Sequence, residues 1–380
     1  MEKNNFNIIL VNLDGLRNDC VELCPTLNDL KDESLYFPKM FTAAPYTFAA
    51  LHAIFSGMYP SRNGMNAYYN MFKFKKDEII TIRQLLQKHG YYTSCDIISK
   101  VVIPNQGFDE LSVFDEETVN FQERHKEIIK KLSSKEKFFL FFHFTETHKH
   151  LVREIVQKYK QESNDDGFFS AQEENIKRYN SYLPSSDDYV SMIINTLKEL
   201  KIDKKTVLIF FSDHGTSIGE RKGEKFYGVY TYDYTINVFC VIKIPGKEPT
   251  FRNEQCRTID LFPTIADIAG IKLDESFRLV QGKSLFNLIE EQEDTEREVF
   301  VETGGLYGPW PSSKKHNVFC VRMENKKLIY NSTPKSWEFY DLEKDPSERD
   351  NIYDENNLVV KKLKNKLSYY FKENKIEIEN

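Results

Sequence analysis

Cysteine is scarce in this sequence, with six thiols spread over 380 residues. The N-terminal stretch MEKNNFNIILVNLDG lacks the basic segment, apolar core and small-residue cleavage site of a standard signal peptide. We therefore expect a cytoplasmic protein whose thiols are reduced. Long hydrophobic runs are also missing. The longest, FFLFFHF at residues 138–144, is too short to cross a bilayer, so no membrane span is expected.

Positive charge is not in excess either. The 52 Lys and Arg residues face 58 Asp and Glu residues, the net charge is −6, and no basic stripe stands out. Nucleic acid is therefore not an expected partner, because it binds to a concentrated positive surface. What the sequence does have is 40% hydrophobic and 29% charged residues, an ordinary balance for a soluble enzyme. Its length suffices for one large α/β core with a smaller appendage.

Strand and helix patterns alternate through most of the chain. This order predicts an α/β fold with a mostly parallel central sheet and helices on both faces. Continuous apolar runs or β-rich segments predict strands at residues 6–13, 34–41, 91–99, 137–144, 206–215 and 235–246. Apolar spacing predicts helices after Pro25 and at residues 47–55, 78–90, 117–133, 187–202 and 258–271.

Two regions depart from this alternation. Residues 152–186 are polar and rich in Ser, Asn and Asp, which predicts a surface excursion or a lid over a site. From residue 296 short strand patterns follow one another and a final helix is predicted at 356–373, which indicates a small antiparallel sheet with a terminal helix. We therefore expect a catalytic α/β domain at 1–295 and a small C-terminal subdomain, packed on the first, at 296–380.

Polar side chains follow three of the predicted strands, where the functional groups of open parallel sheets gather. Asp14 comes directly after the first strand, Asp213 and His214 after the strand at 206–215, and His148 after the strand at 137–144. Two aspartates and a histidine can converge on one divalent cation such as Zn²⁺ or Mn²⁺. Each aspartate could instead begin a turn. His143, inside its strand, is expected to be a packed, hydrogen-bonded core residue.

Such a cation would give a purpose to Thr47, in the stretch FTAAPYTFAALHAIFSGMYPSRNG at residues 41–64. A free Thr hydroxyl is a poor nucleophile at neutral pH, and metal coordination stabilises its alkoxide. A position at the start of a helix would also favour an anion in front of it. The alternative is that Thr47 caps the helix, a role that does not exclude nucleophilic attack.

At this point the chain resembles the sulfatase branch of the alkaline phosphatase superfamily. The resemblance runs through nearly the whole sequence and implies the fold of that superfamily. It rests on six stretches in order: NIILVNLDGLRND, PTLNDL with SLYFPKMFTAAPYT, FFLFFHFTETHKH, LIFFSDHGTSIGE, TIDLFPTIADIAGI with QGKSL, and WEFYDLEKDPSERDNI.

The sequence differs from sulfatases at the reactive position. Sulfatases carry C/S-x-P-S-R-A-x-L-x-T-G, whose first residue is oxidised to formylglycine. Two registers are open: MYPSR would place Met58 there, whereas TFAALHAIFSG matches the spacing to the terminal Gly57 and places Thr47 there. We adopt the second, because spacing fixes geometry along a helix. Thr cannot become formylglycine, and Leu51 replaces the neighbouring Arg. Thr nucleophiles instead resemble those of the superfamily's phosphodiesterases and its phosphoglycerol and phosphoethanolamine transferases.

The resemblance also implies roles for individual residues. His148 matches the substrate-binding histidine, and Lys225 lies where a Lys or His often contacts the anion. Gly15 replaces the second acidic residue of the first motif, which implies one metal ion rather than two. That ion would be Mn²⁺ or Zn²⁺ first, with Ca²⁺ or Mg²⁺ as alternatives. The metal ligands carried over from the family motifs are Asp14, Thr47, Asp213 and His214.

The sequence thus predicts a metal-dependent phosphoester hydrolase or transferase with a covalent Thr47 intermediate. Its substrate would be an anionic ester, either a small molecule or linked to a glycan. Two alternatives remain open. One is a sulfatase, with Thr47 as the direct nucleophile on a sulfate ester; the other is an inactive domain that binds an anion or a glycan. The sequence specifies no oligomeric state.

Overall fold

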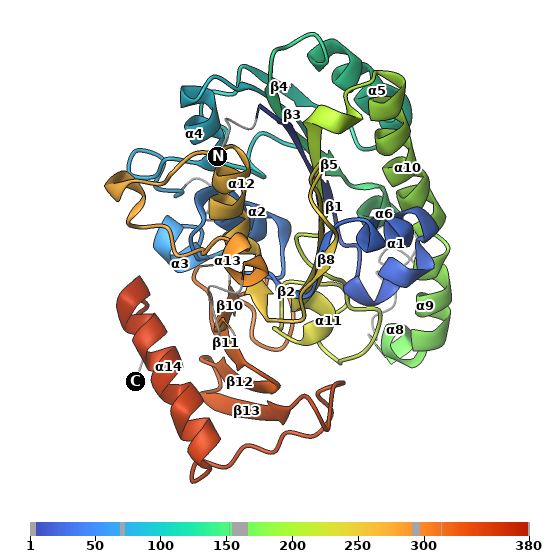
Figure 1. Ribbon diagram of the computed structural model, residues 1–380. Helices are drawn as coiled ribbons and strands as arrows, with labels where there is room; N and C mark the ends of the chain where they lie inside the picture. Colours follow the sequence, from blue (N-terminus) through green and yellow to red (C-terminus); the bar gives the residue numbers. More distant parts are fainter. Residues whose placement is uncertain are drawn as a thin grey trace.

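A mostly parallel sheet runs through the centre of the molecule (Figure 1). The computed structural model describes residues 5–68, 73–151, 153, 166–290, 297–312 and 314–378. Within these residues nine strands form the sheet, in the order β4-β3-β5-β1-β6-β7-β2-β8, with β9 paired to β2. The strands are β1 (Asn7–Leu13), β2 (Leu35–Phe41), β3 (Tyr92–Ile97), β4 (Glu110–Val113), β5 (Phe138–Phe144), β6 (Thr206–Phe211), β7 (Asn237–Lys243), β8 (Thr250–Phe251) and β9 (Cys256–Arg257).

The centre of the sheet consists of three parallel strands, with β1 between β5 and β6. Every residue of these three strands is buried, as expected for continuous apolar runs covered on both faces. Only β7 runs against its neighbours, pairing antiparallel with both β6 and β2 among the described strands. The predicted α/β architecture with a mostly parallel sheet is therefore confirmed.

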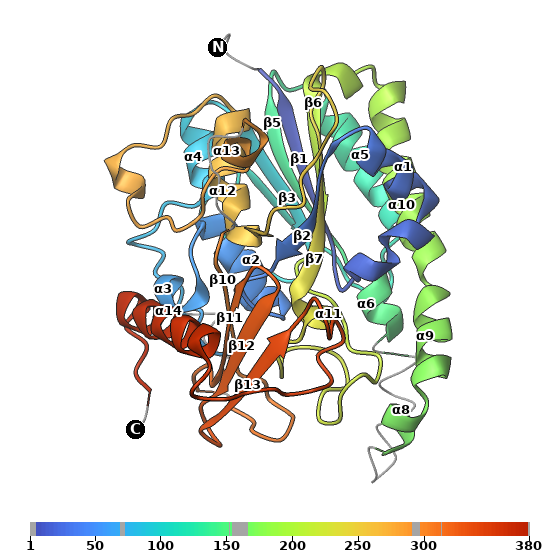
Figure 2. The same ribbon diagram turned by 60° about the horizontal axis from the view of Figure 1, so that its bottom comes forward.

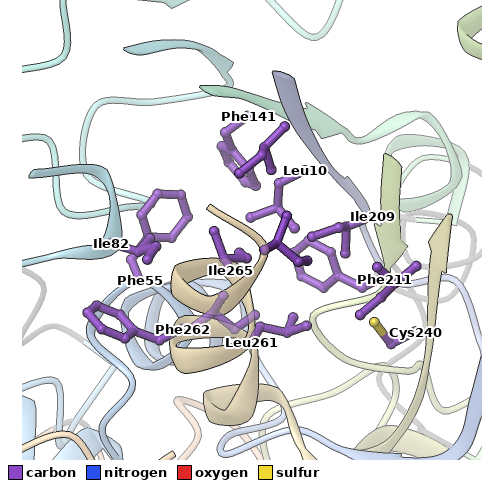
Figure 3. Packing of buried hydrophobic residues seen from close by; sticks show 14 of the residues in the cluster. Leu10, Phe55, Ile82, Phe141, Ile209, Phe211, Cys240, Leu261, Phe262 and Ile265 are labelled. Atoms are coloured by element: carbon purple, nitrogen blue, oxygen red, sulfur yellow. The ribbon is translucent and has the colours of Figure 1, made fainter. Parts of the chain in front are cut away.

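Helices cover both faces of this sheet (Figures 1 and 2). One face carries α1 (Pro25–Asp32), α5 (Phe121–Leu132) and α10 (Leu183–Glu199); the other carries α2 (Thr47–Ser56), α4 (Ile82–Lys88) and α12 (Leu261–Ile268). Each face has its own hydrophobic core. Figure 3 shows the second core, a single cluster that contains Phe262 and Ile265 of α12, Phe55 of α2 and Leu10 of β1. Shorter helices are α3 (Pro60–Asn63), α6 (Glu146–His150), α11 (Asp233–Ile236) and α13 (Phe286–Ile289).

The polar region 152–186 is helical and packed where the structure describes it. It contains α8 (Asp166–Ser170), α9 (Gln172–Asn180) and the first turn of α10, which begins four residues before the prediction because Pro184 fits a helix start. Tyr179 is buried, and its hydroxyl donates to the carbonyl of Gly15 at 2.8 Å. This part is therefore anchored to the loop after β1. Residues 152 and 154–165 lie outside the described residues, and a lid role for the region stays a prediction.

A second, four-stranded antiparallel sheet lies at one end of the molecule (Figure 2). Its buried residues share a core with Ala43, Ala53, Tyr59 and Ile259 of the main part. The predicted small antiparallel sheet and terminal helix are confirmed, whereas the domain boundary at 295/296 falls outside the described residues and stays a prediction. None of the described helices combines the length and apolarity needed to span a bilayer. The elements are β10 (Val299–Thr303), β11 (Val318–Met323), β12 (Lys326–Asn331), β13 (Ser336–Asp341) and α14 (Leu358–Asn374).

Candidate active site

Three predicted metal ligands meet where two neighbouring strands end. Asp14 follows β1, while Asp213 and His214 follow β6, and β1 pairs with β6 in parallel register. One ligand atom of each residue lies within 4.8 Å of the others. Nε2 of His214 is 3.6 Å from Oδ1 of Asp14 and 3.8 Å from Oδ2 of Asp213. All three side chains are buried, so the protein and not bulk water determines their interactions.

Backbone and side-chain contacts fix the orientation of this cluster. The amide of Asp213 donates to Oδ1 of Asn12 at 3.0 Å. Nδ1 of His214 lies 2.8 Å from the carbonyl of Gly215 and donates to it, which turns Nε2 toward the two carboxylates. Position 215 must be glycine, because a Cβ there would lie 2.2 Å from the carbonyl oxygen of Tyr234.

The donor set fits a divalent cation. Oδ1 of Asp14 and Oδ2 of Asp213 are buried and accept no hydrogen bond from any residue that the structure describes. Burial and the charge of Asp14 raise the pKa of Asp213. Burial also acts to raise the pKa of Asp14, but His148 and His143 oppose it and hold that pKa well below its usual value. Two unpaired carboxylate oxygens and an imidazole nitrogen are ligands that Zn²⁺ or Mn²⁺ accepts.

Thr47 lies beside this cluster as the first residue of α2. Its Oγ1 is 3.2 Å from Nε2 of His214 and 3.5 Å from Oδ2 of Asp14. Thr47 does not cap the helix, so the capping alternative is wrong. Tyr46 occupies the N-cap position, and its side chain makes no capping hydrogen bond. Thr47 is partly exposed while the cluster behind it is buried, so its hydroxyl is on the side that an incoming ester can approach.

His143 is buried and hydrogen-bonded, and its partner is the cluster itself. Its Nε2 lies 2.8 Å from Oδ2 of Asp14. Sequence reasoning expected a core histidine and missed this partner. The signal was available in the strand register, because β1 and β5 are parallel neighbours and His143 pairs with Asn12, two residues before Asp14.

His148, in α6, contacts a tyrosine that in turn packs against the ligand cluster. Its Nε2 lies 2.7 Å from the hydroxyl of Tyr227, whose ring centroid is 4.2 Å from that of His214. On the other side, Nδ1 of His148 is 3.8 Å from Oε1 of Glu116. Burial acts to lower the pKa of His148, but the charges of Asp14 and Glu116 outweigh it and raise that pKa above its usual value.

The loop between β6 and α11 supplies a residue that the sequence analysis did not identify. Tyr227 contacts both His148 and His214. Lys225, which was predicted to contact the substrate anion, lies half-buried two residues earlier in the same loop. Its role stays a prediction. The motif letters gave no signal for Tyr227, because the resemblance to the family motifs is loose in this loop.

Comparison with known proteins identifies the family. The Sulfatase family model matches residues 7–271, well over half of the chain. The chain belongs to the sulfatase family. The expected resemblance to this branch of the alkaline phosphatase superfamily is thus confirmed. A second model, the C-terminal part of N-sulphoglucosamine sulphohydrolase, matches residues 223–373 and includes the second sheet of this sulfatase-family chain.

Individual sulfatase-family relatives are distant. An arylsulfatase of Clostridium perfringens is 22% identical over 91% of this chain and 90% of its own length. A choline-sulfatase of Rhizobium meliloti is 29% identical over 48% of this chain. That match covers 35% of the choline-sulfatase, and the chain likewise spans only about a third of the other first curated relatives.

Solved structures show the same fold. Two of them are the phosphonate monoester hydrolase of Agrobacterium radiobacter, with a TM-score of 0.77, and a protein solved in complex with its sugar substrate, with a TM-score of 0.76. The first covers 97% of this chain and 96% of its own at 14% identity. The second, solved with its substrate D-glucosamine-2-N,6-O-disulfate, covers 98% of both chains at 17% identity.

Proposed function

We propose that this chain is a metal-dependent phosphoester hydrolase or transferase, of the phosphodiesterase or phosphoglycerol/phosphoethanolamine transferase type, that acts through a covalent Thr47 intermediate. The observation that carries the proposal is the position of the Thr47 hydroxyl. It lies 3.2 Å from Nε2 of His214 and 3.5 Å from Oδ2 of Asp14, at the helix start and on the accessible side of a buried ligand cluster. A nucleophile placed against a metal site meets the geometric requirement for such chemistry.

Asp14, Asp213 and His214, with Thr47, would hold one divalent ion, Mn²⁺ or Zn²⁺ in first place. That ion, when bound, would lower the pKa of the Thr47 hydroxyl and neutralise negative charge on the ester. The amides at the start of α2 add a positive partial charge in front of Thr47.

The first chemical step forms one bond and breaks one. Oγ of deprotonated Thr47 attacks phosphorus, and the bond from phosphorus to the leaving oxygen breaks with its electron pair on that oxygen. His148, held between Glu116 and Tyr227, is the residue that gives a proton to the leaving oxygen. Lys225 is proposed to contact the ester oxygens.

The second step releases Thr47. The oxygen of water, or of an acceptor hydroxyl in a transferase, attacks phosphorus while the bond from phosphorus to Oγ of Thr47 breaks. His148 takes the proton of the attacking oxygen, which reverses its role in the first step. Both outcomes use the same residues.

A sulfate ester is the second candidate substrate, because most of the relatives carry sulfatase names. The residues favour a phosphoester, since Thr47 cannot become formylglycine and Leu51 replaces the family's arginine. In either case the substrate is proposed to be an anionic ester, of a small molecule or of a glycan. Among the similar proteins, one is named a choline-sulfatase and another was solved with its substrate D-glucosamine-2-N,6-O-disulfate.

The test compares nitrophenyl phosphodiester, phosphomonoester and sulfate as substrates of the Mn²⁺-loaded protein. We expect the diester to be turned over fastest. Thr47→Ala should reduce turnover by about 10³-fold or more while metal content largely persists, and Thr47→Ser, which keeps the hydroxyl, should retain measurable activity. Equal rates for Thr47→Ala and the parent protein would refute the nucleophile, and a preference for the sulfate would favour the second candidate.

A further inference from the structure

The residue before the proposed nucleophile is connected to the second sheet by a buried chain of hydrogen bonds. The hydroxyl of Tyr46 lies 2.6 Å from Nε2 of His316, and Nδ1 of His316 lies 3.1 Å from Oε2 of Glu302. All three side chains are at most 4% exposed. We refer to these three residues as the Tyr46–His316–Glu302 relay.

The charge of Glu302 fixes the direction of its bond with His316. Burial acts to raise the pKa of Glu302, but hydrogen bonds from His316, Ser61 and Tyr370 outweigh it and lower that pKa, so the carboxylate is ionised. An ionised carboxylate only accepts, and therefore Nδ1 of His316 donates. The other ring nitrogen of His316, Nε2, bonds the Tyr46 hydroxyl, so the Tyr46 ring has one preferred orientation.

Glu302 is itself firmly held. Its Oε1 accepts from the amide of Ser61 at 2.9 Å and from the hydroxyl of Tyr370 at 2.6 Å. Its own amide donates to the carbonyl of Ala43 at 3.1 Å. The far end of the relay is thus tied to α3 and α14, while the near end reaches the first residues of α2.

The relay acts on the start of α2. Tyr46 is the N-cap residue, with an extended backbone at φ −159° and ψ 147°, and Thr47 is the first helical residue. Since no side chain caps this helix, the orientation of its first turn depends on how Tyr46 is held. A change in the backbone dihedral angles of Tyr46 would displace the Thr47 hydroxyl from its position 3.2 Å from Nε2 of His214.

We propose that His316 and Glu302 are positioning residues for Thr47, which they orient through the hydroxyl of Tyr46. The kinetic consequence of this inference rests on the proposed function. It gives the second sheet a part in the reaction: β10 and the segment before β11 hold the nucleophile at the start of α2. Small displacements of a reacting atom are costly, with about 10²-fold lost in rate for a misplacement near 1 Å.

The experiment compares two matched Tyr→Phe variants of the full chain. Tyr46→Phe removes the hydroxyl that joins α2 to the relay. Tyr370→Phe removes a hydroxyl that bonds the same carboxylate from α14, outside the relay. We expect Tyr46→Phe to lower kcat for the nitrophenyl diester about tenfold or more with KM nearly unchanged, and Tyr370→Phe to keep kcat within about twofold even where its melting temperature falls equally.

A second pair of variants tests the middle of the relay. His316→Gln keeps a polar group that can bond Tyr46, whereas His316→Ala does not, so the Gln variant should retain more of kcat than the Ala variant. Parent-like kcat in Tyr46→Phe, or the same loss of kcat in Tyr370→Phe, would overturn the positioning role.

Amide hydrogen exchange separates this inference from the proposed function. Exchange at residues 46–50 should speed up in Tyr46→Phe and not in Tyr370→Phe, whether or not the protein turns over any ester. If the parent protein has no activity, the proposed function fails. Amide exchange then tests by itself whether the relay holds the start of α2. Equal exchange in the two variants would then overturn it.

Discussion

Asp213→Asn should change the stability of the protein in opposite directions with and without metal. In the metal-free protein, Asp213 and Asp14 place carboxylates close together in a buried site. Replacing one by a neutral amide of the same size removes the repulsion between them. The new amide can also donate to Oδ1 of Asp14, which has no partner among the described residues. The metal-free variant should therefore be more stable than the parent.

The magnitude follows from the distance. Ligand oxygens of the two carboxylates lie within 4.8 Å, and at an effective dielectric constant of about 20 two unit charges at that distance repel by about 3 kcal/mol. His143 and His148 offset part of this repulsion, so we expect a gain of about 1–3 kcal/mol. For a chain of 380 residues, with an unfolding entropy of about 2 cal/mol/K per residue, this corresponds to roughly 1–4 °C in Tm.

Bound metal should make the parent protein more stable than the Asp213→Asn variant. At an Mn²⁺ concentration about 1,000 times Kd the parent gains about 4.1 kcal/mol, or roughly 5 °C in Tm, which exceeds the advantage of the metal-free variant. The Asp213→Asn variant has lost a charged ligand and should show little of this gain. The assay is thermal unfolding followed by circular dichroism, after treatment with a chelator and again after addition of Mn²⁺.

Asp96 provides the matched control. It is also fully buried, but its carboxylate accepts from Arg124 at 2.7 Å and lies 3.1 Å from Nε2 of His125. Asp96→Asn should therefore destabilise the metal-free protein, by roughly 2 kcal/mol, and leave the gain from Mn²⁺ intact. The reasoning would be refuted if Asp213→Asn lowered the metal-free Tm as Asp96→Asn does, or if it kept the full gain from Mn²⁺.

Two further predictions concern other buried groups. Burial raises the pKa of Glu224 to about 7, so the folded state keeps its proton to higher pH than the unfolded state and loses stability as pH rises from about 4.5 to 7. Glu224→Gln should remove about 3 kcal/mol of this pH dependence, measured by urea unfolding at pH 5 and pH 8; an unchanged dependence would contradict the assignment. His143→Phe removes the hydrogen bond to Asp14 and should weaken Mn²⁺ binding about 10–100-fold by calorimetry, and parent-like affinity would show that His143 does not orient this ligand.

The fold and the centre of the site could be predicted because their signals are local. Strands β1 and β6 are continuous apolar runs, and the polar residues that end them are Asp14 and Asp213. Parallel strands bring their carboxyl ends to one edge, so alternation of strands and helices was enough to place these residues together. Thr47 was proposed as the nucleophile from its spacing to Gly57, which ends α2 in the left-handed conformation that glycine adopts easily.

The remaining contacts depend on packing that no sequence pattern encodes. Tyr227 meets His148 across 79 residues, and Tyr46 meets His316 across 270. The orientation of β7 was not predictable for the same reason, since an apolar run has the same pattern in either direction. In residues 166–186, the described part of the polar region, the few apolar residues that pack, such as Phe168 and Tyr179, were outnumbered by polar ones.

The central position of the first strand has a consequence for biosynthesis. β1 is made first, yet one of its two edges is filled by β6, about 200 residues later. A nascent chain that ends before residue 206 therefore exposes an open apolar edge, the kind of surface that promotes aggregation. Only after Asp213 and His214 have emerged from the ribosome can the proposed metal ligands come together around Asp14, at a point where β7, β8 and β9 have still to be made.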